Sequence, residues 1–103
     1  MDWSSHHLQS EQFALLAEKE ARNQRFKQAV EFYQRAAEQE EYALNCLDEG
    51  KVRTRGITAV SAVSLWLKGQ ELQKAQTLAH KYLESNLLPP FAISQLKEML
   101  EMF

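Results

Sequence analysis

The segment spanning residues 26–47 most limits what this chain can fold into. Within it, apolar residues return every three or four positions, the spacing that places side chains on one side of an α-helix. The stripe consists of Phe26, Ala29, Val30, Tyr33, Ala36, Ala37, Leu44 and Leu47, and only Glu40 interrupts it. Phe32 and Tyr42 fall beside the stripe. The segment therefore predicts a long helix that is covered on more than one side.

The composition extends this prediction to the whole chain. Strong helix formers (Ala, Leu, Glu, Gln, Lys) are abundant, whereas Val, Ile and Thr are scarce, and the 103 residues include only three Gly and two Pro. Such a composition favours a few long helices over strands. A chain of this length can bury one core but not two. We therefore expect one all-α domain, built from antiparallel helical hairpins with about five helices.

Local signals divide the chain into five parts. Residues 1–9 carry no periodicity and are expected to fray. The predicted parts that follow are a hairpin at 10–49, a basic junction at 50–56, a hairpin at 57–84 and a capping helix at 90–102. Asn23 and Gly69 mark the hairpin turns, and Pro90 begins the capping helix, whose apolar face reaches Phe103.

Residues 57–68 are almost entirely apolar or small, which predicts a buried helix. A β-strand is the alternative for this run, but no partner strand is evident elsewhere in the chain. The predicted core consists of Phe13, Leu16, Phe26, Ala29, Tyr33, Val60, Val63, Leu67, Leu72, Ala75, Leu78 and Leu96.

The first hairpin resembles a tetratricopeptide repeat. Phe13-x2-Leu16-Ala17 stands where that family has W-x2-L-G, and Ala29-x3-Tyr33 stands where it has A-x3-F. Ala17 and Ala29 are small enough to let two antiparallel helix axes approach closely. The resemblance implies a domain of stacked helix pairs.

The match to the repeat is incomplete. Glu20 replaces the usual tyrosine, and Glu41 replaces the closing proline. A looser second copy covers residues 59–83, where Leu72-x2-Ala75 repeats the spacing of Phe26-x2-Ala29. The microtubule-interacting-and-trafficking domain, a three-helix bundle, is similar over the first two helices and is the alternative family.

The residues give little support to catalysis. His7 and Glu11 are four apart, but two ligands near a chain end do not make a metal site. Cys46 has no His near it in sequence, which favours a small buried side chain over a reactive thiol. The glycines are too far apart to form a phosphate loop, and a nuclease-type Arg and His pair is absent. We expect no enzymatic activity, no metal and no cofactor.

Charge and hydropathy narrow the range of partners. The formal net charge is −2, so a nucleic-acid partner is disfavoured. No leader segment and no apolar run of membrane-spanning length occur, so we expect a cytoplasmic chain without a membrane partner. Residues 1–50 carry a net charge of −5 and residues 51–103 carry +3. These complementary halves can attract each other within one molecule or between two.

Lys51, Arg53 and Arg55 form the one basic cluster. They either balance the acidic end of the preceding helix or bind an acidic peptide or phosphate partner.

These patterns favour a non-enzymatic adaptor that binds a partner peptide or helix through a helical surface. A self-associating, homodimeric assembly domain is the alternative, and an RNA-processing or nuclease-associated role is a distant third. If the first helix of each pair lines the binding face, as the resemblance implies, that face includes Glu18, Arg22, Val60, Ser64, Leu67 and Lys68. The basic cluster completes the predicted partner-binding residues.

Overall fold

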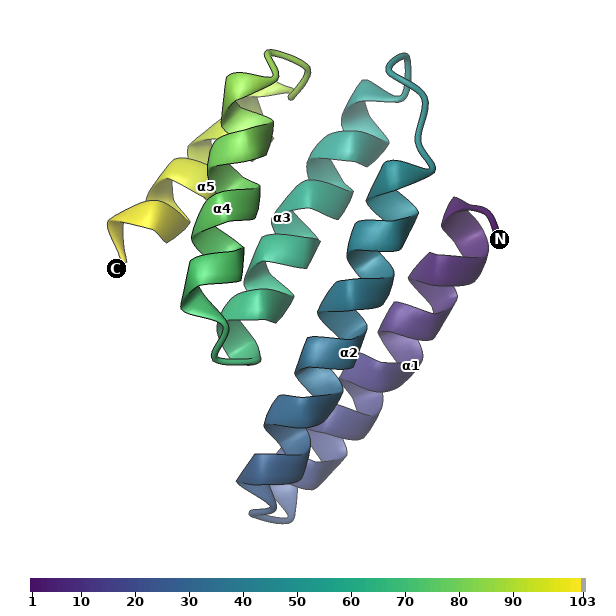
Figure 1. Cartoon of the computed structure of the whole chain (residues 1–103), viewed down its shortest axis with the longest axis vertical. Coiled ribbons are helices and arrows are strands. Elements are labelled where there is room, and N and C mark those ends of the chain that lie inside the picture. Colours follow the sequence, from purple (N-terminus) through teal and green to yellow (C-terminus); the bar gives the residue numbers. More distant parts are fainter. Residues whose placement is uncertain (103) are drawn as a thin grey trace.

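The chain folds into five helices, shown in Figure 1 as a computed structural model that describes residues 1–102. They are α1 (Trp3–Arg22), α2 (Phe26–Asn45), α3 (Val52–Lys68), α4 (Leu72–Glu84) and α5 (Pro90–Glu101). No β-strand occurs within residues 1–102, which confirms the all-α prediction. Residues 57–67 accordingly lie within α3. Phe103 lies outside the described residues.

Successive helices run in alternating directions and pack mainly against their neighbours in the chain (Figure 1). The backbone of α1 lies against α2 alone, whereas α3 is central and packs against α2, α4 and α5. The molecule is a slab with extents of 40 × 33 × 18 Å. In Figure 1, α4 lies in front of α5, and α2 lies in front of the C-terminal half of α1. This arrangement leaves α2 and α4 on either side of α3 on one broad face.

The two hairpin turns share one backbone motif. Gln24 and Gln70, 46 residues apart, adopt left-handed conformations with φ of 61° and 60°. In the first turn, Gln24 N–H donates to the Ala21 carbonyl (3.0 Å) and Arg25 N–H donates to the Glu20 carbonyl (2.8 Å). The equivalent bonds in the second turn measure 3.0 and 2.9 Å. Both are Schellman motifs, which satisfy carbonyls that a helix end would otherwise leave free.

The N-terminal segment is helical, contrary to the expectation that residues 1–9 fray. Asp2 caps α1, because its side chain accepts a hydrogen bond from the Ser5 N–H at 2.9 Å. That bond also lowers the pKa of Asp2. The Trp3 indole Nε1–H then donates to the Thr58 hydroxyl on α3 at 3.1 Å. The early part of α1 is thus held by contacts to residues distant in the sequence, which periodicity does not detect.

The predicted basic junction at 50–56 is mostly the first turn of α3. Helix α2 ends at Asn45, and α3 begins at Val52. Arg55 is 7% exposed and donates from Nη2 to the Leu47 carbonyl at 3.2 Å, so it stabilises the end of the preceding helix. Gly56 lets α5 approach, since a Cβ there would lie 2.7 Å from the Pro89 ring carbons.

The core runs along α2, α3 and α4 and is rich in alanine. Ala17 and Ala29 are buried as predicted, and so are Val63, Ala75, Leu78 and Leu96. Phe13, Tyr33, Val60 and Leu67 are partly buried against this core.

The core prediction is wrong for three residues, which are exposed. Phe26 is 64% exposed, Leu72 48% and Leu16 42%. Phe26 and Leu72 are the first residues of α2 and α4, directly after the turns. Leu16 lies on α1, the edge helix, which has one neighbouring helix to cover it.

Candidate functional site

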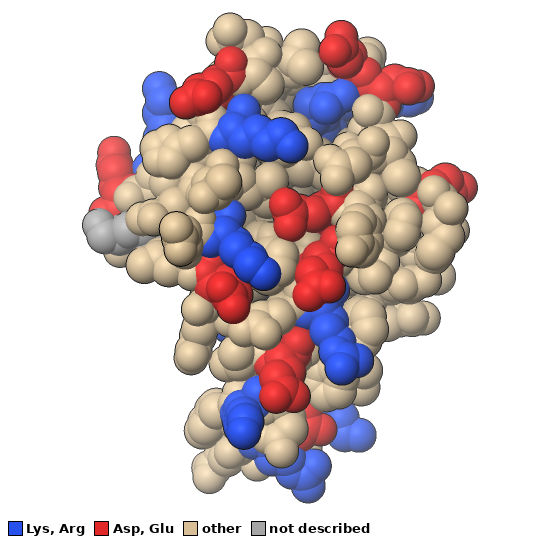
Figure 2. Space-filling view, in the orientation of Figure 1, with Lys and Arg blue, Asp and Glu red and all other residues tan. Residues whose placement is uncertain are grey.

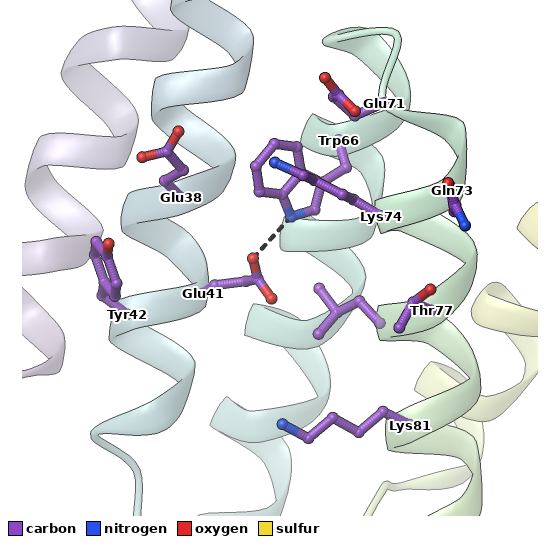
Figure 3. A pocket seen from close by; sticks show the side chains of 10 residues that line it. Glu38, Glu41, Tyr42, Trp66, Glu71, Gln73, Lys74, Thr77 and Lys81 are labelled. Atoms are coloured by element: carbon purple, nitrogen blue, oxygen red, sulfur yellow. Dashed lines mark hydrogen bonds between the residues drawn. The ribbon is translucent and has the colours of Figure 1, made fainter.

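A groove of about 640 Å³ runs between α2 and α4 with α3 as its base (Figure 3). Acidic and basic side chains both lie around the middle of this face (Figure 2). The lining residues include neither His nor Cys; they are Glu38, Glu41, Tyr42, Trp66, Glu71, Gln73, Lys74, Thr77, Leu78 and Lys81.

Trp66 and Leu78 form the apolar base of the groove. Trp66 is 2% exposed and Leu78 is 5% exposed, so both are anchored in the core. The Trp66 Nε1–H donates to Glu41 Oε2 at 3.0 Å, and the Lys74 ammonium lies 4.7 Å from the centre of the indole ring (Figure 3). The indole is therefore held between an acceptor on α2 and a cation on α4.

The two walls of the groove differ in charge. The α2 wall carries Glu38 and Glu41, and the α4 wall carries Lys74 and Lys81, with Glu71 at the N-terminal end of α4 (Figure 3). Within residues 1–102, none of these five side chains takes part in an ion pair within 4.0 Å. Their charges thus remain available to a bound molecule.

A second pocket, of about 500 Å³, lies at the start of α2, beside the α3–α4 turn. Its lining includes Phe26, Val30 and Gln70. Gln34 closes one side by donating from Nε2 to the Gly69 carbonyl at 2.8 Å. This pocket has a single exposed aromatic ring and no basic wall comparable to that of the groove.

A polar cluster is buried between α1 and α2, at the position where Glu40 interrupts the apolar stripe. The Glu40 side chain is 2% exposed, and its Oε1 lies 2.9 Å from His7 Nδ1. His7 Nε2 lies 3.0 Å from Glu11 Oε1, and the His7 ring stacks on Trp3 with centroids 4.6 Å apart. Glu40 is therefore a buried acid with a single specific partner on the neighbouring helix.

The environment raises the pKa of His7. Burial of the imidazole by itself lowers this pKa, but the hydrogen bond to Glu40 and the charges of Glu40 and Glu11 together outweigh it. When His7 is protonated, its positive charge lies beside the Glu40 carboxylate between the two helices. Two sequence signals point to this cluster, the polar interruption at Glu40 and the spacing of four between His7 and Glu11.

The predicted partner-binding residues do not form one surface. Glu18 and Arg22 are exposed on α1, and Lys51, Arg53 and Lys68 are exposed at the two ends of α3. Val60, Ser64 and Leu67 are partly buried, and Arg55 is buried. None of the nine lines the groove. The groove was not predicted because its walls come from α2 and α4, which are not sequence neighbours.

Cys46 is exposed, contrary to the prediction that it is buried. It follows the last residue of α2, and its Sγ lies 3.6 Å from the Met1 carbonyl. Within residues 1–102, no three His, Cys, Asp or Glu side chains gather closely enough to hold a metal ion. None of the helices in this part of the chain is both long and apolar enough to cross a membrane.

Comparisons with protein-family models, with curated proteins and with solved structures gave no match to this chain.

Proposed function

We propose that this chain is a non-enzymatic interaction module that binds a helix or peptide of a partner protein in the groove between α2 and α4. The observation that carries the proposal is the charge arrangement of the groove. An apolar base of Trp66 and Leu78 lies between an acidic wall and a basic wall, and within residues 1–102 the charged side chains of these walls make no ion pair. Grooves between helices commonly accept an amphipathic helix, whose apolar face covers the base while its polar edges meet the walls.

The chemistry of the lining supports binding over catalysis. Its polar groups are carboxylates, ammonium groups, amides and hydroxyls, without the imidazole or thiol that most often acts as a base or nucleophile. The Glu41 carboxylate already accepts a bond from the Trp66 indole.

We further propose that the two hairpins are a tetratricopeptide-like pair of repeats with a capping helix. The repeated turn at Gln24 and Gln70 supports this, and so does the burial of Ala17 and Ala29. In this proposal the partner meets the second helix of each pair, α2 and α4. The α1 and α3 residues predicted from the family resemblance then lie outside the main contact.

A homodimeric assembly domain is the second candidate. It is favoured by Leu8 and Leu15, which are 55% and 64% exposed on the edge helix α1. They are seven residues apart, so they lie on the same side of that helix.

A bulky charged residue in the groove tests the main proposal. Thr77 is exposed and lines the groove on α4, so Thr77→Arg blocks the groove without opening the core. Ser94→Arg is the matched control, because Ser94 is exposed on α5 away from the groove. Circular dichroism establishes that both variants fold.

The measurement is affinity capture from extracts of the native host, with recovered proteins quantified by mass spectrometry. We expect Thr77→Arg to recover about tenfold less of a partner protein that the wild type and Ser94→Arg both recover. Equal recovery by all three proteins would show that the groove is not the binding surface.

A further inference from the structure

The outer face of α1 has the chemistry that the groove between α2 and α4 requires. Leu8 and Leu15 project from this face, as their exposure indicates. Glu11 and Glu18 are also exposed, and they too are seven residues apart. Seven residues are two helical turns, or about 10.5 Å along the axis. The face therefore combines an apolar stripe with an acidic edge of two carboxylates. Glu11 also lies 3.0 Å from His7 Nε2 within its own molecule, whereas Glu18 takes part in no ion pair within residues 1–102.

The basic wall of the groove repeats that spacing. Lys74 and Lys81 are also seven residues apart, on α4, and Glu71 lies three residues before Lys74. On α1, Arg22 lies four residues after Glu18 and is exposed. If α1 of one molecule lay antiparallel to α4 of another, three pairs of opposite charges would lie level with each other. The pairs are Glu11 with Lys81, Glu18 with Lys74 and Arg22 with Glu71.

The acidic α2 wall of the groove also has an oppositely charged counterpart on α1. On a helical projection drawn at 100° per residue, the leucine stripe lies between Lys19 on one side and Glu11 and Glu18 on the other. In the same antiparallel orientation, Lys19 faces the α2 wall, where Glu38 and Glu41 lie. A parallel orientation would reverse the two edges of α1 and place Glu11 and Glu18 against these carboxylates. The charge pattern therefore selects a single direction.

We propose that the groove of one molecule binds α1 of a second copy of this chain, antiparallel to α4. In this register Leu15 of the second copy lies level with Leu78, and Leu8 lies level with the C-terminal end of α4. Its Glu18 lies level with Lys74 and draws that ammonium away from the Trp66 indole. This inference rests on the proposed function, because it uses the groove as the docking surface and names its occupant. A heterologous partner must then displace α1 of the second copy, so self-association regulates access to the groove.

The shape of the molecule is compatible with this contact. Helix α1 is at the edge of the slab and its backbone packs against α2 alone, so its outer face projects as a ridge. The groove lies on the broad face formed by α2, α3 and α4 (Figure 1). Both elements are therefore accessible in the single molecule.

Reciprocal charge reversal tests the contact. Multi-angle light scattering follows the mass of each protein over a concentration series up to about 1 mM, starting from the 11.9 kDa of one chain. We expect the wild type to exceed the mass of one chain as concentration rises. Glu18→Lys and Lys74→Glu each weaken self-association by about tenfold, since an exposed intermolecular ion pair becomes repulsive. Mixing the two variants restores it.

Leu15→Asp tests the apolar stripe without altering the charged edges, and Leu15 is exposed enough that the fold does not depend on it. Nuclear magnetic resonance of the two indole N–H groups locates the contact. Trp66 lies at the base of the groove, whereas the Trp3 indole is bonded to Thr58 within its own copy. We expect the Trp66 signal to shift with concentration in the wild type but not in Leu15→Asp, while Trp3 stays constant.

A wild type that stays monomeric over the whole series overturns the inference. Self-association that both charge-reversed variants retain unchanged, or that leaves the Trp66 signal fixed, overturns it equally. None of these results bears on the proposed function, which Thr77→Arg tests separately by capture of a heterologous partner.

Discussion

At the residue scale, His7 is important to the fold because it is the specific partner of a buried carboxylate. Glu40 has a 2% exposed side chain, and its Oε1 lies 2.9 Å from His7 Nδ1. Removing one partner of a buried polar pair leaves the other without compensation. We expect His7→Ala to lower the free energy of unfolding by roughly 1–3 kcal/mol, measured by urea denaturation. His80→Ala, on the exposed side of α4, is the control and should change it little.

The raised pKa of His7 also makes stability depend on pH. The folded-state pKa of His7 lies above the ordinary histidine value of about 6.5, so proton binding by His7 favours the folded state. This contribution is complete below about pH 6.5 and is lost as pH rises through the folded-state pKa. The melting temperature of the wild type should therefore fall as pH rises from about 6.5 through the folded-state pKa of His7, and the melting temperature of His7→Gln should fall less over the same range. An equal fall in both proteins would assign the effect to other groups.

At the scale of elements, the contact between α3 and α5 depends on the missing side chain of Gly56. In a helix interior, Gly→Ala ordinarily stabilises by about 1 kcal/mol. Here the new Cβ would lie 2.7 Å from Pro89 ring carbons and 3.1 Å from the Ala92 Cβ, and a proline ring cannot rotate away. We expect Gly56→Ala to destabilise by about 1–2 kcal/mol, because overpacking exceeds the gain in propensity.

Gly50→Ala is the matched control for that substitution. A Cβ at Gly50 meets nothing within 4 Å, so the change should stay within about 0.5 kcal/mol of wild type. Thermal unfolding followed by circular dichroism measures both variants. A Gly56→Ala protein as stable as wild type would mean that α5 shifts to accept the methyl group.

At the scale of the whole molecule, we expect the local stability of each helix against opening to rise with the number of helices that it packs against. Helix α3 packs against three helices, whereas the backbone of α1 packs against one. Hydrogen exchange should therefore be slowest in the middle of α3 and faster in the outer turns of α1. In arrays whose elements contact mainly their neighbours, ends open before the centre. Uniform protection along the chain would indicate one fully cooperative unit instead.

The sequence was sufficient to predict the helices and most of the inner core. Helix propensity and a period of 3.6 residues are local properties, so the all-α class, two hairpins and a capping helix follow from them. The burial of Ala29, Val63, Ala75, Leu78 and Leu96 follows as well, because each lies on a periodic apolar face. The turn positions agree with the sequence to within one residue: Asn23 and Gly69 mark the turns in the sequence, and Gln24 and Gln70 adopt the left-handed conformation there.

Only the tertiary structure decided which surfaces meet. Leu16, Phe26 and Leu72 have the pattern of core residues, yet each is exposed. Leu16 lies on the edge helix α1, and Phe26 and Leu72 begin their helices directly after a turn. The start of α1 is held by Thr58, Gln39 and Glu40, which are at least 33 residues away in the chain. The groove joins α2 to α4, two helices separated by α3. Periodicity describes one face of one helix, whereas burial and binding depend on how several helices are placed.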